Sequence, residues 1–115
     1  MVYNYNATLI RVVDGDTVDC WVDLGFDIRI KERIRLSGVD APETRTRDLG
    51  EKKKGMETKD WLISQLKRDN DRFILTTDKY KPTGKYGRTI GTLFLLDGTN
   101  LNELMLQEGL ASPYN

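Results

Sequence analysis

The chain has 115 residues, and its 18 basic residues balance its 18 acidic residues. A chain of this length buries one hydrophobic core, so we expect a single domain over residues 1–115. Zero net charge argues against a protein that coats nucleic acid through an overall basic surface. One cysteine excludes an internal disulfide and a multi-thiolate zinc site, and the absence of histidine removes the commonest general base.

Three segments in the first third of the chain, 8–13, 17–24 and 28–36, have the composition of β-strands. In the second segment Cys20 alternates with Val18 and Val22, which predicts a buried small hydrophobic residue rather than a reactive thiol. The third segment alternates apolar and basic residues, so its two faces differ. Its apolar face carries Ile28, Ile30, Ile34 and Leu36, and its basic face carries Arg29, Lys31, Arg33 and Arg35. Only Glu32 interrupts the apolar face, which indicates a bulge or bend.

The rest of the chain predicts two helices and two more strands. Residues 44–55 read as a polar, basic loop, followed by a helix that begins at Glu51 or Lys53 and ends at Lys67. Met56, Leu62, Ile63 and Leu66 lie near helical spacing in it. Strands are expected over 73–77 and 89–96, with a loop between them. Asn100 is placed to cap a last helix over 101–107, and Gly109 follows its end.

This order of elements, β-β-β-α-β-β-α, predicts a mainly β protein with two helices (α+β). A small five-stranded barrel of the OB type fits it better than a sandwich. The first residues are polar and aromatic, and the apolar run 93–96 is too short to cross a bilayer. We therefore expect a soluble protein without a signal peptide, a transmembrane segment or a membrane partner.

Carboxylates and arginines gather in three motifs. These are Asp-Gly-Asp-Thr at 14–17, the segment from Arg33 to Glu43 that ends in Val-Asp-Ala-Pro-Glu, and Lys-Tyr-Gly-Arg at 85–88. Carboxylate oxygens suit a hard cation, and guanidinium groups bind phosphate esters through paired hydrogen bonds. Together the motifs indicate a metal-assisted phosphodiesterase site.

Each motif has a simpler interpretation when it is taken alone. Asp-Gly is a strong turn signal, Asp40 and Glu43 could be solvent-exposed loop charges, and Arg35 and Arg88 could be solvated surface cations. The basic residues Arg45, Arg47, Lys52, Lys53 and Lys54 could bind a phosphate backbone or lie in a solvated loop. The joint occurrence of the three motifs, in this order and on these elements, favours the site.

The three motifs resemble the signatures of the staphylococcal nuclease (thermonuclease) family, and the resemblance extends from about Ala7 to Ala111. It implies an OB-fold and calcium-dependent hydrolysis of DNA and RNA to 3′-phosphorylated products. The substrates it implies are single-stranded DNA, RNA and duplex DNA. Family members commonly continue into a further helix, so we also expect exposed apolar groups near Leu106, Leu110 and Tyr114 to support a homodimer or another oligomer.

Carried over residue by residue, the resemblance assigns three sets of roles. Asp16 and Asp40 would be carboxylate ligands of Ca²⁺, and Ala41 would contribute its main-chain carbonyl. Glu43 would act as general base or orient water, while Arg35 and Arg88 would hold the phosphate and stabilise the transition state. Lys85, Tyr86 and Tyr114 would contact a terminal phosphate or stack on the nucleotide. A non-catalytic OB module that binds single strands or protein tails, and a structural calcium-binding domain, are the rival interpretations.

Overall fold

Five strands of the chain close into a barrel in the computed structural model, which describes residues 2–77 and 89–114. The strands are β1 (Tyr3–Asp14), β2 (Thr17–Gly25), β3 (Ile28–Leu36), β5 (Arg72–Thr77) and β6 (Thr89–Phe94), in the barrel order β1-β2-β3-β6-β5. The β3–β6 pair is parallel, and the other described pairs are antiparallel. The predicted mainly β fold with a five-stranded barrel and this element order is therefore confirmed.

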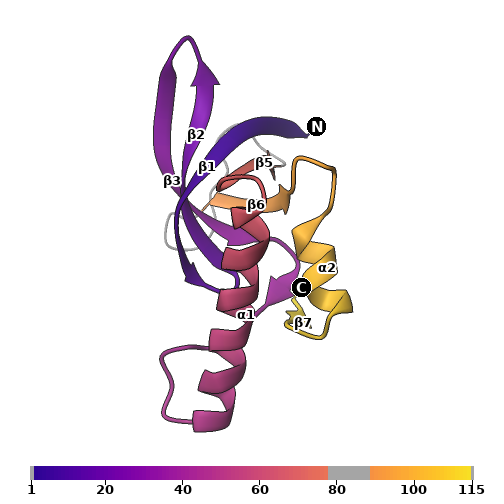
Figure 1. The fold of residues 1–115 in the computed structure, drawn as a ribbon. Coiled ribbons are helices and arrows are strands. Elements are labelled where there is room, and N and C mark those ends of the chain that lie inside the picture. The colour runs from indigo at the N-terminus through magenta and orange to yellow at the C-terminus, as the bar shows by residue number, and fades with distance from the viewer. Residues whose placement is uncertain (1, 78–88, 115) are drawn as a thin grey trace.

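In the described part of the chain, two helices and a two-stranded sheet accompany the barrel. Helix α1 (Leu49–Lys67) packs on β1 and β5, and helix α2 (Leu101–Gln107) packs on β6 and β4. The short strands β4 (Val39–Asp40) and β7 (Ser112–Pro113) pair with each other outside the barrel. Figure 1 shows the β2–β3 hairpin rising beyond the barrel at one end, while the first half of α1 extends beyond it at the other. None of the helices in the described residues is long and apolar enough to cross a membrane.

The core is one cluster of buried side chains from the barrel interior and the two helices. Its fully buried members include Ile34 and Leu93 of the barrel, Leu62 and Leu66 of α1, and Met105 of α2. Cys20 belongs to this cluster, and burial raises the pKa of its thiol to about 12. It is therefore the small buried hydrophobic residue that its alternation predicted.

Several predicted boundaries were wrong for identifiable reasons. β1 begins at Tyr3 rather than Thr8, because its first half pairs with β5. α1 begins at Leu49, because the Asp48 side chain accepts hydrogen bonds from the N–H groups of Gly50 and Glu51 and caps the helix there. Lys52, Lys53 and Lys54 thus lie in the first turns of α1 rather than in a loop.

The predicted burial faces also need correction. In α1 the buried positions are Gly55, Thr58, Leu62 and Leu66, whereas Met56 is exposed. β2 pairs with β3 past Glu32 without a shift of register, so the expected bulge is absent there. Instead, Glu32 accepts a hydrogen bond from the Thr89 hydroxyl at 3.1 Å. β6 ends at Phe94, two residues before the predicted end.

The second helix follows its predicted signals. Asn100 caps α2 by accepting a hydrogen bond from the Glu103 N–H at 3.0 Å, and Gly109 follows the helix with φ of +71°. Leu106 and Leu110 pack against the core cluster. Both side chains are only partly buried, and Tyr114, the third residue on which the expected oligomer was based, is 57% exposed. The oligomeric state stays a prediction.

Candidate active site

The Asp-Gly-Asp-Thr motif forms the tight turn between β1 and β2, with Gly15 and Asp16 as its central residues. A Cβ atom added at Gly15 would lie 2.5 Å from Thr58 Cγ2 and 2.9 Å from the Ala41 Cβ. The glycine is thus required by space, because the turn presses against α1 and against the segment after β4. This packing places Asp16, whose side chain is only 14% exposed, beside β4.

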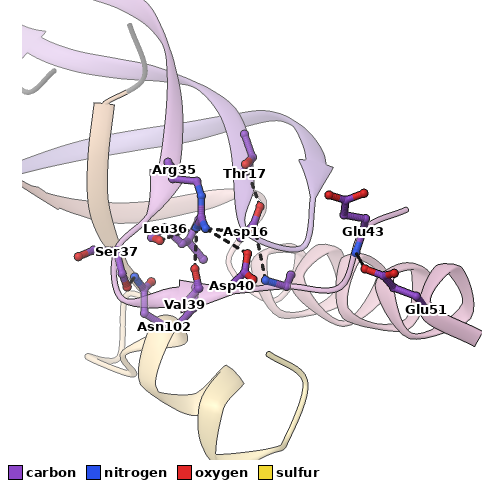
Figure 2. A network of polar contacts seen from close by, with 11 residues as sticks. Asp16, Thr17, Arg35, Leu36, Ser37, Val39, Asp40, Glu43, Glu51 and Asn102 are labelled. Atoms are coloured by element: carbon purple, nitrogen blue, oxygen red, sulfur yellow. Dashed lines mark hydrogen bonds and ion pairs between the residues drawn. The ribbon is translucent and has the colours of Figure 1, made fainter. Parts of the chain in front are cut away.

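Arg35 joins the carboxylates of two separate segments. Its Nη2 atom lies 3.5 Å from Asp16 Oδ2 and 3.5 Å from Asp40 Oδ1 (Figure 2). The Arg35 side chain is 13% exposed, so it is not the solvated strand arginine of the simpler interpretation. Residues from the β1–β2 turn, β3 and β4 therefore meet at one point, as the motifs predicted for these three side chains.

The Nη1 atom and the flat face of the Arg35 guanidinium also make contacts. Its Nη1 atom donates to the main-chain oxygens of Leu36 at 2.9 Å and Val39 at 2.7 Å. The Tyr114 ring lies 5.3 Å from the guanidinium carbon, within the range of a cation–π contact. These contacts restrict the side chain to one orientation, which is the condition for binding a phosphate with little further loss of entropy.

The segment that carries Asp40 is held from the other side by the C-terminal residues. Val39 pairs with Pro113 and Asp40 with Ser112, and the Tyr114 N–H donates to the Gly38 carbonyl at 3.0 Å. Buried Asn102 donates to the Ser37 carbonyl at 2.9 Å and accepts from the Leu93 N–H at 3.1 Å. Nothing in the sequence motifs indicated this clamp, because it depends on pairing between distant segments.

Ala41 and Glu43 follow on the segment between β4 and α1. The Ala41 N–H donates to Asp16 Oδ2 at 3.0 Å, which ties that segment to the β1–β2 turn. Glu43 is exposed, and its own N–H donates to Glu51 Oε1 at 3.3 Å (Figure 2). Glu43 does not contact Asp16, Arg35 or Asp40, but it lines the same surface hollow as Asp40 and Ala41.

Three predicted residues, Lys85, Tyr86 and Arg88, lie outside the described residues. Within residues 2–77 and 89–114, no group of three histidine, cysteine, aspartate or glutamate side chains is spaced to hold a metal ion. Asp16 and Asp40 form a pair of carboxylates from different segments, and Ala41 lies next to both. This all-oxygen set has the chemistry that Ca²⁺ prefers.

A second charged cluster was not found from the sequence. Buried Asp19 accepts hydrogen bonds from Arg33 Nε at 2.8 Å and from Arg11 Nε at 2.9 Å. The hydrogen bond from Arg33 is the main cause that lowers the pKa of Asp19 to about 2, with a smaller contribution from Arg11. Alternation along β2 could have predicted that Asp19 lies on the same face as the basic residues. It could not predict the strand register that places Asp19 opposite Arg33.

Comparison with known proteins gives relatives along nearly the whole chain. The chain is 32% identical over 109 residues to an uncharacterized endonuclease of Escherichia coli O157:H7. The aligned region covers 95% of this chain and 61% of that protein. It is 32% identical over 114 residues to Protein ParB of Escherichia coli, covering 92% of this chain and 55% of ParB. It is 29% identical over 119 residues to a micrococcal nuclease of Shigella flexneri, covering 96% of this chain and 59% of that protein.

This chain therefore spans between 55% and 61% of the length of these curated relatives. Residues 33–115 match the family described as staphylococcal nuclease homologue. The match contains Arg35, Asp40, Ala41 and Glu43, and the relatives extend the similarity toward the β1–β2 turn. Since the matched region is most of the chain, the chain belongs to the staphylococcal nuclease family.

Proposed function

We propose that the chain is a calcium-dependent nuclease that hydrolyses phosphodiester bonds of DNA and RNA with little sequence specificity. Its products would carry 3′-phosphates. The single observation that carries the proposal is the meeting of Asp16, Arg35 and Asp40 from three separate segments, with Arg35 Nη2 at 3.5 Å from each carboxylate. Family membership adds support, because two relatives are named as nucleases.

Arg35 is the residue proposed to hold the phosphate. Its guanidinium lies 3.5 Å from Asp40, whose side chain is 58% exposed, and it donates to two main-chain carbonyls. With Nη1 bonded to these carbonyls, Nε and Nη2 would donate the two hydrogen bonds to phosphate oxygens, and the guanidinium charge would stabilise the charge that develops in the transition state. Arg88 is proposed as its partner in holding the phosphate.

Glu43 is the proposed general base. Its carboxylate is exposed and lines the same hollow as Asp40, so water reaches both. A carboxylate at this place can accept the proton of a water molecule as its oxygen attacks phosphorus. The bond between phosphorus and the leaving 5′-oxygen breaks on the opposite side, and this oxygen takes up a proton from water.

The donor set fits a hard divalent cation. Asp16 and Asp40 would hold Ca²⁺ through carboxylate oxygens, and Ala41 would add its main-chain carbonyl. A bound Ca²⁺ ion would supply Lewis-acid stabilisation of charge on the phosphate. The Asp16 carboxylate is held in one orientation, because its oxygens accept hydrogen bonds from the Ala41 N–H and the Thr17 hydroxyl.

Lys85, Tyr86 and Tyr114 are proposed to contact the nucleotide. Single-stranded substrates should be cut faster than duplex, because aromatic rings can stack on unpaired bases. Contacts to phosphate carry no sequence information, so cleavage should depend weakly on sequence.

The test is cleavage of plasmid and single-stranded DNA with calcium or with a chelator. The wild-type protein should cut only with calcium, and magnesium should support cleavage poorly because it demands tighter octahedral geometry. Asp40→Asn should weaken calcium binding measured by calorimetry, whereas Asp60→Asn, an exposed aspartate on α1, should not. Equal cleavage in calcium and in chelator would refute the proposal. Binding of single-stranded DNA without any cleavage would favour the non-catalytic OB module.

A further inference from the structure

Strand β3 carries a row of four cations that ends in the candidate site. Arg29, Lys31, Arg33 and Arg35 occupy alternate positions, so their side chains lie on one face of the strand. Arg35 lies in the candidate site, while Arg29 lies near the end of the hairpin that rises beyond the barrel (Figure 1). The register with β2 places Asp23, Trp21 and Asp19 beside the first three cations.

The cations of this row differ in how strongly they are already neutralised. Lys31 is exposed and makes no ion pair with any residue that the structure describes. Arg29 is also exposed, and its guanidinium carbon lies 4.4 Å from the centroid of the Trp21 ring. Arg33 remains 46% exposed and shares the single carboxylate of Asp19 with Arg11. None of the three is therefore fully neutralised.

The face around the row is positive although the whole chain is neutral. Across β1, β2 and β3 it combines four cations, Arg11, Arg29, Lys31 and Arg33, with the carboxylates of Asp19 and Asp23. Asp14 adds a third carboxylate, whose charge acts on Arg33, and the cations stay in excess by one. Asp23 turns one oxygen to the Gly25 N–H at 2.8 Å. A local excess of positive charge in a neutral protein marks a place where an anionic partner binds.

The spacing of the row indicates a linear polyanion. Alternate residues of a strand lie about 6.7 Å apart, which is comparable to the distance between successive phosphates of an extended single strand. Trp21 and the flat guanidinium of Arg29 add surfaces on which a base can stack. An acidic polypeptide could use the charges, but it would leave the aromatic surface without a partner.

We propose that an extended single strand of DNA or RNA lies along this face of β3, from Arg35 toward the end of the β2–β3 hairpin. The nucleotides beyond the bond that is cut would contact Arg33, Lys31 and then the Arg29–Trp21 pair. The inference rests on the proposed function, because it takes the strand at Arg35 to be the substrate.

The experiment compares the wild-type protein with the double variant Arg29→Glu, Lys31→Glu. Binding of a fluorescent oligothymidylate of about 15 nucleotides, a length within the usual site size of such grooves, is measured by anisotropy over a range of salt in chelator. We expect an affinity loss of at least about 10-fold and a shallower salt dependence, by about 1.4 in the logarithmic slope for two lost phosphate contacts. The double variant Lys67→Glu, Arg68→Glu makes an equal charge change at two exposed positions at the end of α1; it is the matched control and should bind as the wild type does.

A second measurement separates the strand path from the catalytic site. In calcium, the ratio of kcat/KM for the long strand to that for a nitrophenyl phosphodiester of a single nucleotide should fall in the double variant. Unchanged affinity and salt slope in the double variant would overturn the inference, as would competition by polyglutamate equal to that of DNA. If the double variant lost DNA binding and the wild type cleaved no DNA, the proposed nuclease activity would be refuted. The proposed path of the strand along β3 would still be supported.

Discussion

The two ends of the β2–β3 hairpin share the same strands and the same alternation, but they have opposite surroundings. At the barrel end Ile34 and Leu36 are fully buried and Arg35 is held between two carboxylates. At the far end Ile28 and Ile30 are 56% and 40% exposed, and Phe26 at the turn is wholly exposed. One alternating pattern thus gives a packed, charged site at one end and a two-sided solvent-exposed ribbon at the other.

The difference arises from what pairs with β3. Ile34, Arg35 and Leu36 have β6 as a neighbour on the second side, and the barrel closes there. Residues 28–33 have β2 on one side, and no other described strand pairs with them. Alternation therefore predicts which face a side chain occupies, whereas the position of barrel closure decides whether that face is buried.

The largest effect is expected when an isoleucine of β3 is replaced by alanine at each end of the hairpin. Ile34→Ala removes a fully buried side chain and should lower the free energy of unfolding by about 2–5 kcal/mol. Ile30→Ala, on the same strand and face, should cost less than about 1 kcal/mol because much of the side chain is already in water. Urea denaturation of both variants measures the difference, and equal losses would contradict the contrast between the ends.

The next effect concerns the charge at the barrel end. Arg35→Ala should lower kcat for single-stranded DNA by about 10²-fold or more, because a donor to the transition state is removed. Arg35→Lys should recover little of the rate, since an ammonium group cannot donate in the same paired geometry. Arg68→Ala, which removes an exposed arginine 4.0 Å from Asp97, is the control and should keep its rate. Steady-state cleavage assays compare the three, and a full rate in Arg35→Ala would remove this residue from the mechanism.

A smaller effect is expected for Asp19, which lies between the two ends. Asp19→Asn should cost about 1–2 kcal/mol near neutral pH, because charge-assisted hydrogen bonds to two partly exposed arginines are lost. The lowered pKa of Asp19, about 2, means that this stabilisation is present above about pH 4 and is lost as the pH falls toward 2.

The measurement is thermal unfolding of the wild type and Asp19→Asn between about pH 2 and pH 7, the range over which an aspartate with a lowered pKa titrates. The gap between their stabilities should narrow as the solution becomes more acidic. A gap that stays constant down to the lowest pH would show that the charge of Asp19 does not stabilise the fold.

The smallest effect is expected at the exposed end. Phe26 and Asp27 both have positive φ, +53° and +63°, as in a type I′ hairpin turn. Phe26→Asn should raise the free energy of unfolding by about 0.5 kcal/mol, because asparagine adopts this conformation more readily than an aromatic residue and Phe26 makes no buried contact. A destabilised variant in the same urea assay would mean that the Phe26 ring packs against something after all.

Much of the fold followed from local signals in the sequence. Alternation placed β2 and β3, the Asp-Gly turn placed Asp16, and Asn100 marked the start of α2. Helix α1 began earlier than predicted because Asp48, which caps it, stands among polar residues that resemble a loop. The first half of β1 was missed because its partner, β5, lies far along the chain.

The sequence predicted which residues form the candidate site better than it predicted the contacts that position them. The motifs named Asp16, Arg35 and Asp40, which the structure brings together, but they could not show that Arg35 stands between the carboxylates. The roles of Asn102, Gly15 and the β4–β7 pair depend on contacts between segments that no local pattern encodes. Lys85, Tyr86 and Arg88 lie outside the described residues, so their roles stay predictions.

The pairing of β4 with β7 has a consequence for how the protein is made. Val39 and Asp40 pair with Pro113 and Ser112, which are synthesised later. At about 5–20 residues per second the delay is roughly 4–15 s. Until then the backbone groups of β4 have no strand partner, and Arg35 lacks the ring of Tyr114. In a growing chain the site therefore stays unfinished until residues 112–114 have been made and can pair with β4.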